Sequence, residues 1–197
     1  TQQQFEDFDK IKIIFLLPVK GGSGGAHSVV QEVTEMRRLG VAAKIAVRPE
    51  HRPRLLRIYR DVENVDELFV AFTSANIVKV TSKFDIVVGT IFNSMVLVKQ
   101  IVEVNPHILP AYYIQDYEPL FFPEDSKNWH EARASYNLVP GAILFAKTNW
   151  IANMVEQERG VTVHKVSPSI DHTVYNPASR KESGKVRISA MIRPQTP

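Results

Sequence analysis

The chain of 197 residues contains no cysteine. This absence excludes a disulfide framework and thiolate metal sites, and it fits a reducing compartment. Long apolar runs are also absent, because stretches such as "IIFLLPV" at 13–19 are far shorter than the ~20 residues that span a bilayer. The opening "TQQQFEDFDK" is acidic and polar, unlike a signal peptide. We expect a soluble, cytoplasmic chain.

An excess of one charge is missing as well. The 24 Lys and Arg residues and 21 Asp and Glu residues give a net charge of +3, which is too small to indicate a nucleic-acid partner. The six histidines lack the spacing of a zinc-binding pair, so no zinc site is indicated. With 44% hydrophobic residues, the chain has the composition of an ordinary globular protein.

Short apolar runs alternate with segments of helical spacing along most of the chain. The predicted strands cover 11–17, 42–47, 84–89, 110–115, 142–147 and 161–166. The predicted helices cover 26–39, 91–104 and 148–159, with Gly40 and Gly160 as stops and Thr148 or Asn149 as a cap. Buried strands separated by helices indicate an α/β fold, a Rossmann-like parallel sheet with helices on both faces.

A glycine-rich stretch, "PVKGGSGGAHSVV" at 18–30, joins the first strand to the first helix. Glycine lets backbone N–H groups approach an anion at a helix N-terminus, so the stretch favours a phosphate ligand. It is not a P-loop, because no lysine follows the glycines. A dinucleotide fingerprint is incomplete too, since His27 stands where the third glycine belongs.

Small and polar residues follow nearly every predicted strand. Because ligands collect beyond the carboxyl ends of parallel strands, these residues together favour a binding site. They are Gly21–Gly25, Arg48, Thr90, Asp116–Glu118, Thr148–Asn149 and Ser167–Asp171.

The end of the chain has a different pattern. "SPSIDHTVYNPASRKESGK" at 167–185 carries proline, serine and charge without periodicity, which is typical of a linker, and "KVRISAMIRPQTP" then begins a new strand. A single strand does not fold alone. We therefore expect a Rossmann-like domain over 1–170, an interdomain linker over 171–184, and the first strand of a truncated second domain over 185–197.

Several motifs resemble those of GT-B glycosyltransferases, particularly the large retaining family numbered four. "GGAHSVVQEVTEMRRLGVAAKIAV" at 24–47 is similar to the glycine loop, helix and second-strand entry of that family. "YYIQDYEPLFFPE" at 112–124 resembles a segment of rhamnan-type polysaccharide glycosyltransferases, and "SPSIDHTVYNP" at 167–177 resembles the end of their N-terminal domain. The resemblance implies the N-terminal half of a GT-B fold and transfer of a sugar, for example rhamnose, from a nucleotide sugar to a polysaccharide or lipid-linked glycan.

The resemblance also implies roles for particular residues. Backbone amides of the glycine loop would stabilise the departing diphosphate without a metal ion, and cationic groups would come from the other domain. Asp116 would orient a sugar hydroxyl or help to deprotonate the acceptor, and Glu118 could share or replace that role; the alternative is that one of them caps the turn at 118–124. The diphosphate-binding residues would be Gly22, Ser23, Gly24, Gly25 and His27, and the acceptor- or sugar-binding residues Thr90, Tyr117 and Asn149.

The sequence leaves open a further partner, a membrane surface, and two other functions. The stretch "RPEHRPRLLRIYR" at 48–60 mixes arginines with apolar residues, which fits either a solvated helix face or a peripheral contact with an anionic membrane through Arg52, Arg54, Arg57 and Arg60. Arg48 lies where an NADP-dependent oxidoreductase recognises a 2′-phosphate, but no tyrosine is followed four residues later by lysine. A non-catalytic nucleotide- or glycan-binding module is the third alternative.

Overall fold

A single parallel sheet forms the centre of the molecule. The computed structural model describes residues 10–20, 23–170, 172, 175–176 and 188, and within them seven strands pair in the order β3-β2-β1-β4-β5-β6-β7, each pair parallel. The strands are β1 (Lys12–Leu16), β2 (Ala42–Val47), β3 (Phe69–Ala71), β4 (Ile86–Gly89), β5 (Leu109–Ile114), β6 (Ile143–Ala146) and β7 (Val163–Lys165). The predicted Rossmann-like parallel sheet is confirmed.

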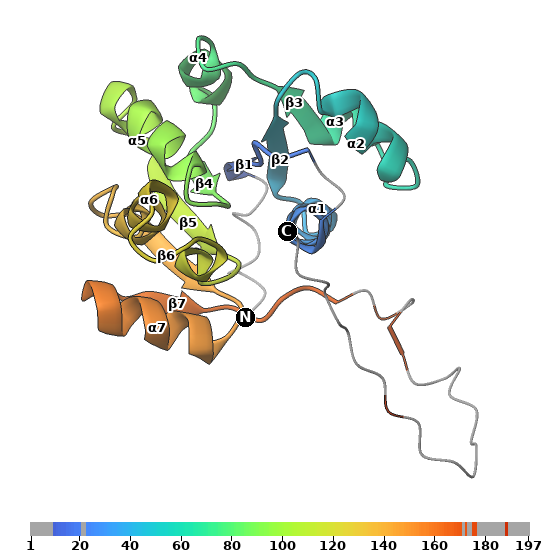
Figure 1. Ribbon diagram of the computed structural model, residues 1–197. Coiled ribbons are helices and arrows are strands. Elements are labelled where there is room, and N and C mark those ends of the chain that lie inside the picture. The colour runs from blue at the N-terminus through green and yellow to red at the C-terminus, as the bar shows by residue number, and fades with distance from the viewer. Residues whose placement is uncertain (1–9, 21–22, 171, 173–174, 177–187, 189–197) are drawn as a thin grey trace.

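Helices cover both faces of the sheet, as Figure 1 shows. The α-helices are α1 (Gly24–Arg38), α2 (Arg52–Ile58), α3 (Val65–Leu68), α4 (Ile77–Thr81), α5 (Ser94–Val104), α6 (Lys127–Ser135) and α7 (Asn149–Arg159), and η2 (Glu118–Phe121) is a 3₁₀ helix. One apolar core contains side chains of α1, α2 and α3 with one face of the sheet, and a second contains side chains of α4, α5 and α7 with the other face. Side chains alternate between the two cores along each strand, as strand geometry requires.

The helix ends follow the chemistry that the sequence indicates. Gly40 follows the C-cap of α1 and has a φ of 92°, and Gly160 is itself the C-cap of α7 and has a φ of 63°. That backbone conformation favours glycine. Of the two residues proposed to cap α7, Thr148 is the one that does so, because its hydroxyl accepts a hydrogen bond from the backbone N–H of Ile151 at 3.2 Å.

The expected boundaries at the end of the chain are not tested. The linker predicted over 171–184 and the strand predicted over 185–197 lie outside the described residues, except for His172, Tyr175, Asn176 and Ile188.

Candidate functional site

The candidate site lies where the chain changes direction across the sheet. β1 and β4 are neighbours, yet the chain leaves β1 toward α1 on one face and leaves β4 toward α5 on the other. Leu16 pairs with Gly89, so the two strands end level with each other. In open parallel sheets such a point is the usual location of a ligand crevice. The glycine stretch and Thr90 follow these two strand ends.

The N-terminus of α1 presents backbone donors at this point. The Ser23 hydroxyl accepts from the N–H of Ala26 at 3.3 Å, and its carbonyl accepts from His27 at 3.0 Å, which makes Ser23 the N-cap. In the described part of the chain, the N–H groups of Gly24 and Gly25 meet no acceptor. Unpaired donors at the positive end of a 15-residue helix suit an anion. Gly22, the other glycine predicted to bind diphosphate, lies outside the described residues.

Gly25 has a structural reason to be glycine. A Cβ placed there would lie 3.2 Å from Oε1 of Gln115, whereas one placed on Gly24 would meet nothing within 4 Å. Gln115 directly follows β5 and donates from Nε2 to the carbonyl of Thr90 at 3.2 Å. Its buried Oε1 has no partner among the described residues. Gln115 therefore joins the loops after β1, β4 and β5, a role that the sequence analysis missed.

Thr90 is buried and holds the strand ends together. Its side chain has 0% exposure, its hydroxyl donates to the carbonyl of Leu16 at 2.7 Å, and its N–H donates to the hydroxyl of Ser94 at 2.9 Å. The Thr90 side chain has no exposed surface in this structure, and the predicted contact between Thr90 and a sugar stays a prediction.

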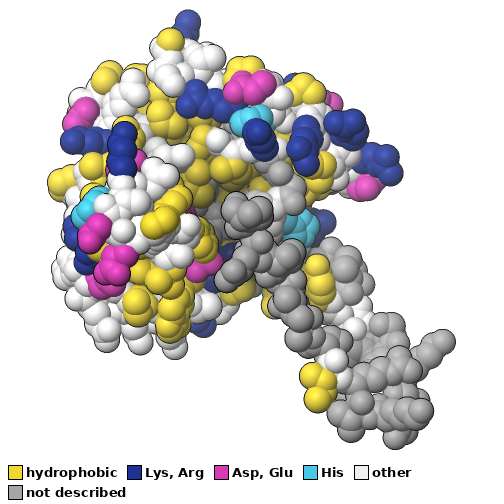
Figure 2. Space-filling view, viewed as in Figure 1, with side chains coloured by type: hydrophobic (Ala, Val, Ile, Leu, Met, Phe, Trp, Pro, Cys, Tyr) yellow, Lys and Arg dark blue, Asp and Glu magenta, His cyan; other side chains and the backbone are white. Residues whose placement is uncertain are grey.

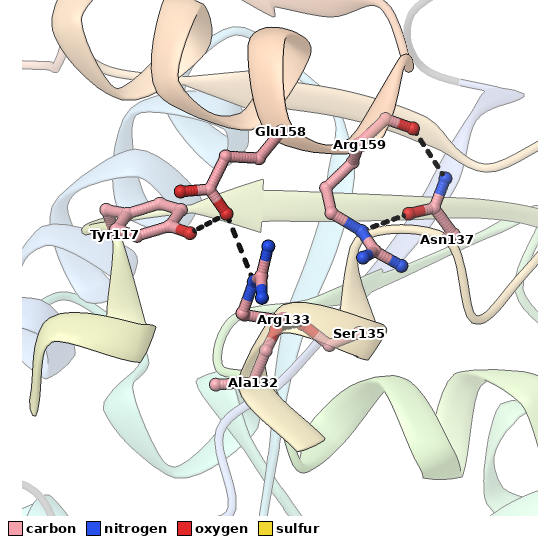
Figure 3. Close-up of polar contacts among 7 residues, drawn as sticks. All are labelled: Tyr117, Ala132, Arg133, Ser135, Asn137, Glu158 and Arg159. Atoms are coloured by element: carbon pink, nitrogen blue, oxygen red, sulfur yellow. Dashed lines mark hydrogen bonds and ion pairs between the residues drawn. The ribbon is translucent and has the colours of Figure 1, made fainter. Parts of the chain in front are cut away.

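Tyr117 was also predicted to contact the acceptor, and it too points into the core. Only 3% of it is exposed, and its ring stacks on Tyr136 with centroids 6.0 Å apart. Figure 3 shows its hydroxyl bonded to the carboxylate of Glu158, which Arg133 also contacts at 3.1 Å. Burial and the Glu158 carboxylate raise the pKa of Tyr117 to about 12. The side chain fastens η2 and α7 together and lies away from solvent.

The two candidate catalytic carboxylates have opposite surroundings. Asp116 is exposed, and its Oδ1 accepts from the N–H of Tyr117 at 2.9 Å. Glu118 is only 5% exposed, and its Oε2 accepts from the N–H of Phe92 at 2.7 Å, which ties η2 to the loop after β4. Burial raises the pKa of Glu118 to about 7, although the Phe92 hydrogen bond opposes the rise. Asp116 is therefore the accessible carboxylate of the two and Glu118 ties two loops together, while the catalytic roles predicted for both stay predictions.

His27 and Asn149 are both exposed. The His27 ring stacks on Tyr59, after α2, at 6.1 Å between centroids, and it lines a cavity of about 500 Å³ between α1 and residues 59–64. Asn149 is the first residue of α7. Neither side chain has a hydrogen bond within the described residues that fixes it toward the glycine stretch.

A lysine that the sequence analysis counted as the end of a strand also reaches the site. Lys147 directly follows β6, and Ile114 pairs with Ala146, so Lys147 and Gln115 leave neighbouring strands side by side. The Lys147 ammonium donates to the hydroxyl of Ser28 in α1 at 3.1 Å. A cation therefore lies one helical turn from the glycines although none follows them in sequence.

The arginines of 48–60 have mixed roles. Arg52 donates to the carbonyls of Phe69 and Asp66 at 3.0 and 2.9 Å, so it supports the fold and is not available for a membrane. Arg48 lies over the Phe72 ring at 4.7 Å and donates to the Ser74 hydroxyl at 3.1 Å. The remaining three, Arg54, Arg57 and Arg60, are exposed, and Figure 2 shows basic side chains gathered on the side of the molecule that carries α2.

Within the described ranges, no group of three or more His, Asp or Glu side chains is placed to hold a metal ion. No described helix is both long and apolar enough to cross a membrane.

Comparisons with known proteins detect similarity at the level of structure. No protein-family model and no curated protein sequence matches the chain. The structure is similar to Anabaena HepE in complex with UDP-glucose (TM-score 0.66, 16% identity, 84% of this chain and 46% of HepE) and in complex with UDP and glucose (0.67, 16%, 84% and 46%). It is also similar to an alpha-glucosyltransferase in complex with UDP and DNA containing an HMU base (0.55, 12%, 86% and 45%).

The chain has the fold of one domain of a GT-B glycosyltransferase. It spans a little under half of the length of these solved proteins, which agrees in extent with a single domain of the GT-B type. Identities of 12–16% establish the fold and leave the chemistry of the site to be argued from its own residues.

A substitution at Gly24 tests whether the glycine stretch binds an anion. Gly24→Val should leave the thermal midpoint of this domain within a few degrees, because a Cβ at that position meets nothing within 4 Å. If the N-terminus of α1 binds a nucleoside diphosphate, the variant should bind it much more weakly, since a β-branched side chain blocks close approach of an anion to the backbone. Calorimetric titration with UDP measures the loss, and unchanged affinity would remove the α1 N-terminus from the site.

Proposed function

We propose that the chain is the N-terminal, acceptor-side domain of a glycosyltransferase. The enzyme transfers a sugar from a nucleotide-sugar donor to a polysaccharide or lipid-linked glycan. The observation that carries the proposal is the pair of N–H groups of Gly24 and Gly25, which meet no acceptor among the described residues, at the β1–β4 crossover. Support comes from the solved proteins of the same fold, which are in complex with UDP or UDP-glucose.

The chemistry follows from where negative charge develops. As the bond between the sugar and the diphosphate breaks, the leaving group gains charge, and prepositioned backbone donors stabilise it in the transition state. The positive end of α1 adds to this stabilisation. Exposed Asp116, at the end of β5, orients the acceptor hydroxyl or takes its proton.

The finer identity of the substrates rests on sequence. The segment 112–124 favours a retaining family-four enzyme that acts on polysaccharide, with rhamnose as the sugar. UDP is the nucleotide to test first, because it occupies the solved proteins of the same fold. One of those proteins is in complex with DNA, but the net charge of +3 on this chain is too small to indicate a nucleic-acid acceptor.

Exposed Arg54, Arg57 and Arg60 support a peripheral contact with the anionic inner face of a membrane, where a lipid-linked acceptor is found. Such a contact would place the enzyme in the cytoplasm at the membrane surface.

A donor screen tests the proposed function. The natural polypeptide that contains this chain is incubated with UDP-glucose, UDP-galactose, GDP-mannose and dTDP-rhamnose, with and without a glycan acceptor, and the nucleoside diphosphate released is measured. Acceptor-dependent release from one donor supports the proposal. Nucleotide binding without any release would favour a non-catalytic module, and binding of NADP⁺, titrated in parallel, without any release would favour an oxidoreductase.

The same screen tests for a metal requirement. Because backbone donors and a lysine surround the leaving-group site, excess EDTA should leave turnover unchanged. A loss of turnover on chelation that manganese or magnesium restores would contradict this proposal and point to a metal–diphosphate complex.

A further inference from the structure

Lys147 occupies an unusual position for a lysine at the end of a strand. Its side chain does not extend into solvent but lies across β5, with Nζ 5.7 Å from the centroid of the Tyr113 ring. The ammonium then reaches α1 and donates to the hydroxyl of Ser28 at 3.1 Å. The stem is therefore packed on an aromatic surface while the charged end is directed to the first turns of α1 (residues 24–28).

The charge of Lys147 has no close counter-ion. Among the described residues, no carboxylate lies within ion-pair distance of its ammonium. Glu32 is the neighbour one turn after Ser28, but its oxygens accept from the N–H and hydroxyl of Ser169 at 2.8 and 2.6 Å. Asp116 accepts from the N–H of Tyr117. An ammonium has three donors, and one hydroxyl occupies only one of them.

Partial burial disfavours the charged form of the Lys147 side chain, and the nearby carboxylates compensate for this only in part. Burial lowers the pKa of Lys147, and the more distant Glu32 and Asp116 carboxylates only oppose the decrease. A partly buried cation with open donors binds an anion more strongly than an exposed one, because less solvent screens the attraction.

We propose that Lys147 binds a phosphate group of the substrate and supplies the cation that the glycine stretch lacks. Ser28, its partner, is four residues after Gly24, and four residues of helix rise about 6 Å. A phosphate at the N–H groups of Gly24 and Gly25 would therefore lie about one turn of α1 from Ser28, where the Lys147 ammonium is held. This inference rests on the proposed function, and it places the donor phosphates between α1 and the end of β6.

Binding of two probes to the 197-residue protein tests the proposal. Inorganic pyrophosphate and UDP are titrated into wild-type protein, Lys147→Met and Lys165→Met, with the affinity measured by calorimetry. Lys165 is the matched control, because it ends the adjacent strand β7 and donates to the Ser167 hydroxyl at 3.2 Å, but is exposed. Loss of a charge-assisted contact should weaken binding of both probes to Lys147→Met by about tenfold or more. Lys165→Met should stay within about twofold, as expected of an exposed charge.

The outcomes separate this inference from the proposed function. Equal affinity of wild type and Lys147→Met for UDP would overturn the role of Lys147 while leaving nucleotide binding in place. Lys147-dependent binding of pyrophosphate without binding of UDP would support the lysine site and count against a nucleotide donor. If wild-type protein binds neither probe at millimolar concentration, the lysine proposal is wrong, and the donor screen alone decides the function.

A second readout distinguishes contact from a merely structural role. The ¹³Cε resonance of Lys147, followed against pH, should report a higher pKa with pyrophosphate bound than without it, because a bound anion stabilises the charged form. Unchanged titration would contradict direct contact. Should Lys147→Met fail to fold, Lys147→Arg and Lys147→Gln replace it, with binding expected to persist in the first and fall in the second.

Discussion

Wild-type protein should lose roughly 3 kcal/mol of stability relative to the Glu118→Gln variant as the pH rises from 4 to 8. Burial raises the pKa of the folded Glu118 carboxyl from 4.5 to about 7, and each unit corresponds to about 1.4 kcal/mol. Between these two values the unfolded chain has released the proton that the folded state keeps. The stabilising contribution is therefore complete below pH 4.5 and is lost as the pH passes through 7.

The glutamine substitution isolates this titration. Its side-chain oxygen still accepts from the N–H of Phe92, so the link between η2 and the loop after β4 remains. Urea unfolding of both proteins at several pH values gives the difference in stability, in which all other titrating groups cancel. Glu124→Gln, an exposed change six residues later, provides the control and should follow the wild-type curve. Parallel curves for wild type and Glu118→Gln would show that Glu118 has an ordinary environment.

The parallel sheet was predictable because its strongest signals are local. Runs such as "FDIVVG" at 84–89 have no helical periodicity, and Gly40 and Gly160 end α1 and α7 with the positive φ that favours glycine. The elements that the sequence analysis missed are short or polar. β3 has three residues and α4 five, too few for a periodicity, and α6 buries only Ala132 and Ser135.

The sequence indicated which residues lie at the carboxyl edge of the sheet but not which way their side chains point. Sequence shows which residues follow the strands, and these do gather at one edge of the sheet. It does not show side-chain direction, and Thr90 and Glu118 point inward because strand ends must bond to one another there. Gln115 and Lys147 were overlooked because each directly follows an apolar run and was counted with the strand. Both could have been found from one feature of the sequence. A long polar side chain directly after a strand can fold back across the adjacent strand of the sheet.

Asp116→Asn should lower the turnover of the natural polypeptide by at least ~100-fold, since general acid–base groups contribute roughly 10²–10⁴-fold. The structure indicates that this substitution removes the charge without disturbing the fold. Asp116 is exposed, and its one hydrogen bond in the described part of the chain is accepted by Oδ1 from the N–H of Tyr117. An asparagine oxygen accepts the same bond, so the turn is kept while the charge and the proton affinity are removed.

Asp116→Ala, measured beside it, separates catalysis from capping. If the carboxylate acts on the acceptor hydroxyl, both variants lose turnover alike, and only the alanine variant loses stability, by about 1 kcal/mol. If Asp116 serves the turn alone, Asp116→Asn keeps activity within a few-fold and Asp116→Ala shows only the stability loss. Affinity for UDP should change little in either variant, because Gly24, Gly25 and Lys147 hold the diphosphate in this scheme. A large fall in UDP affinity with Asp116→Asn would contradict this role. It would show that the carboxylate contacts the nucleotide donor and not the acceptor hydroxyl.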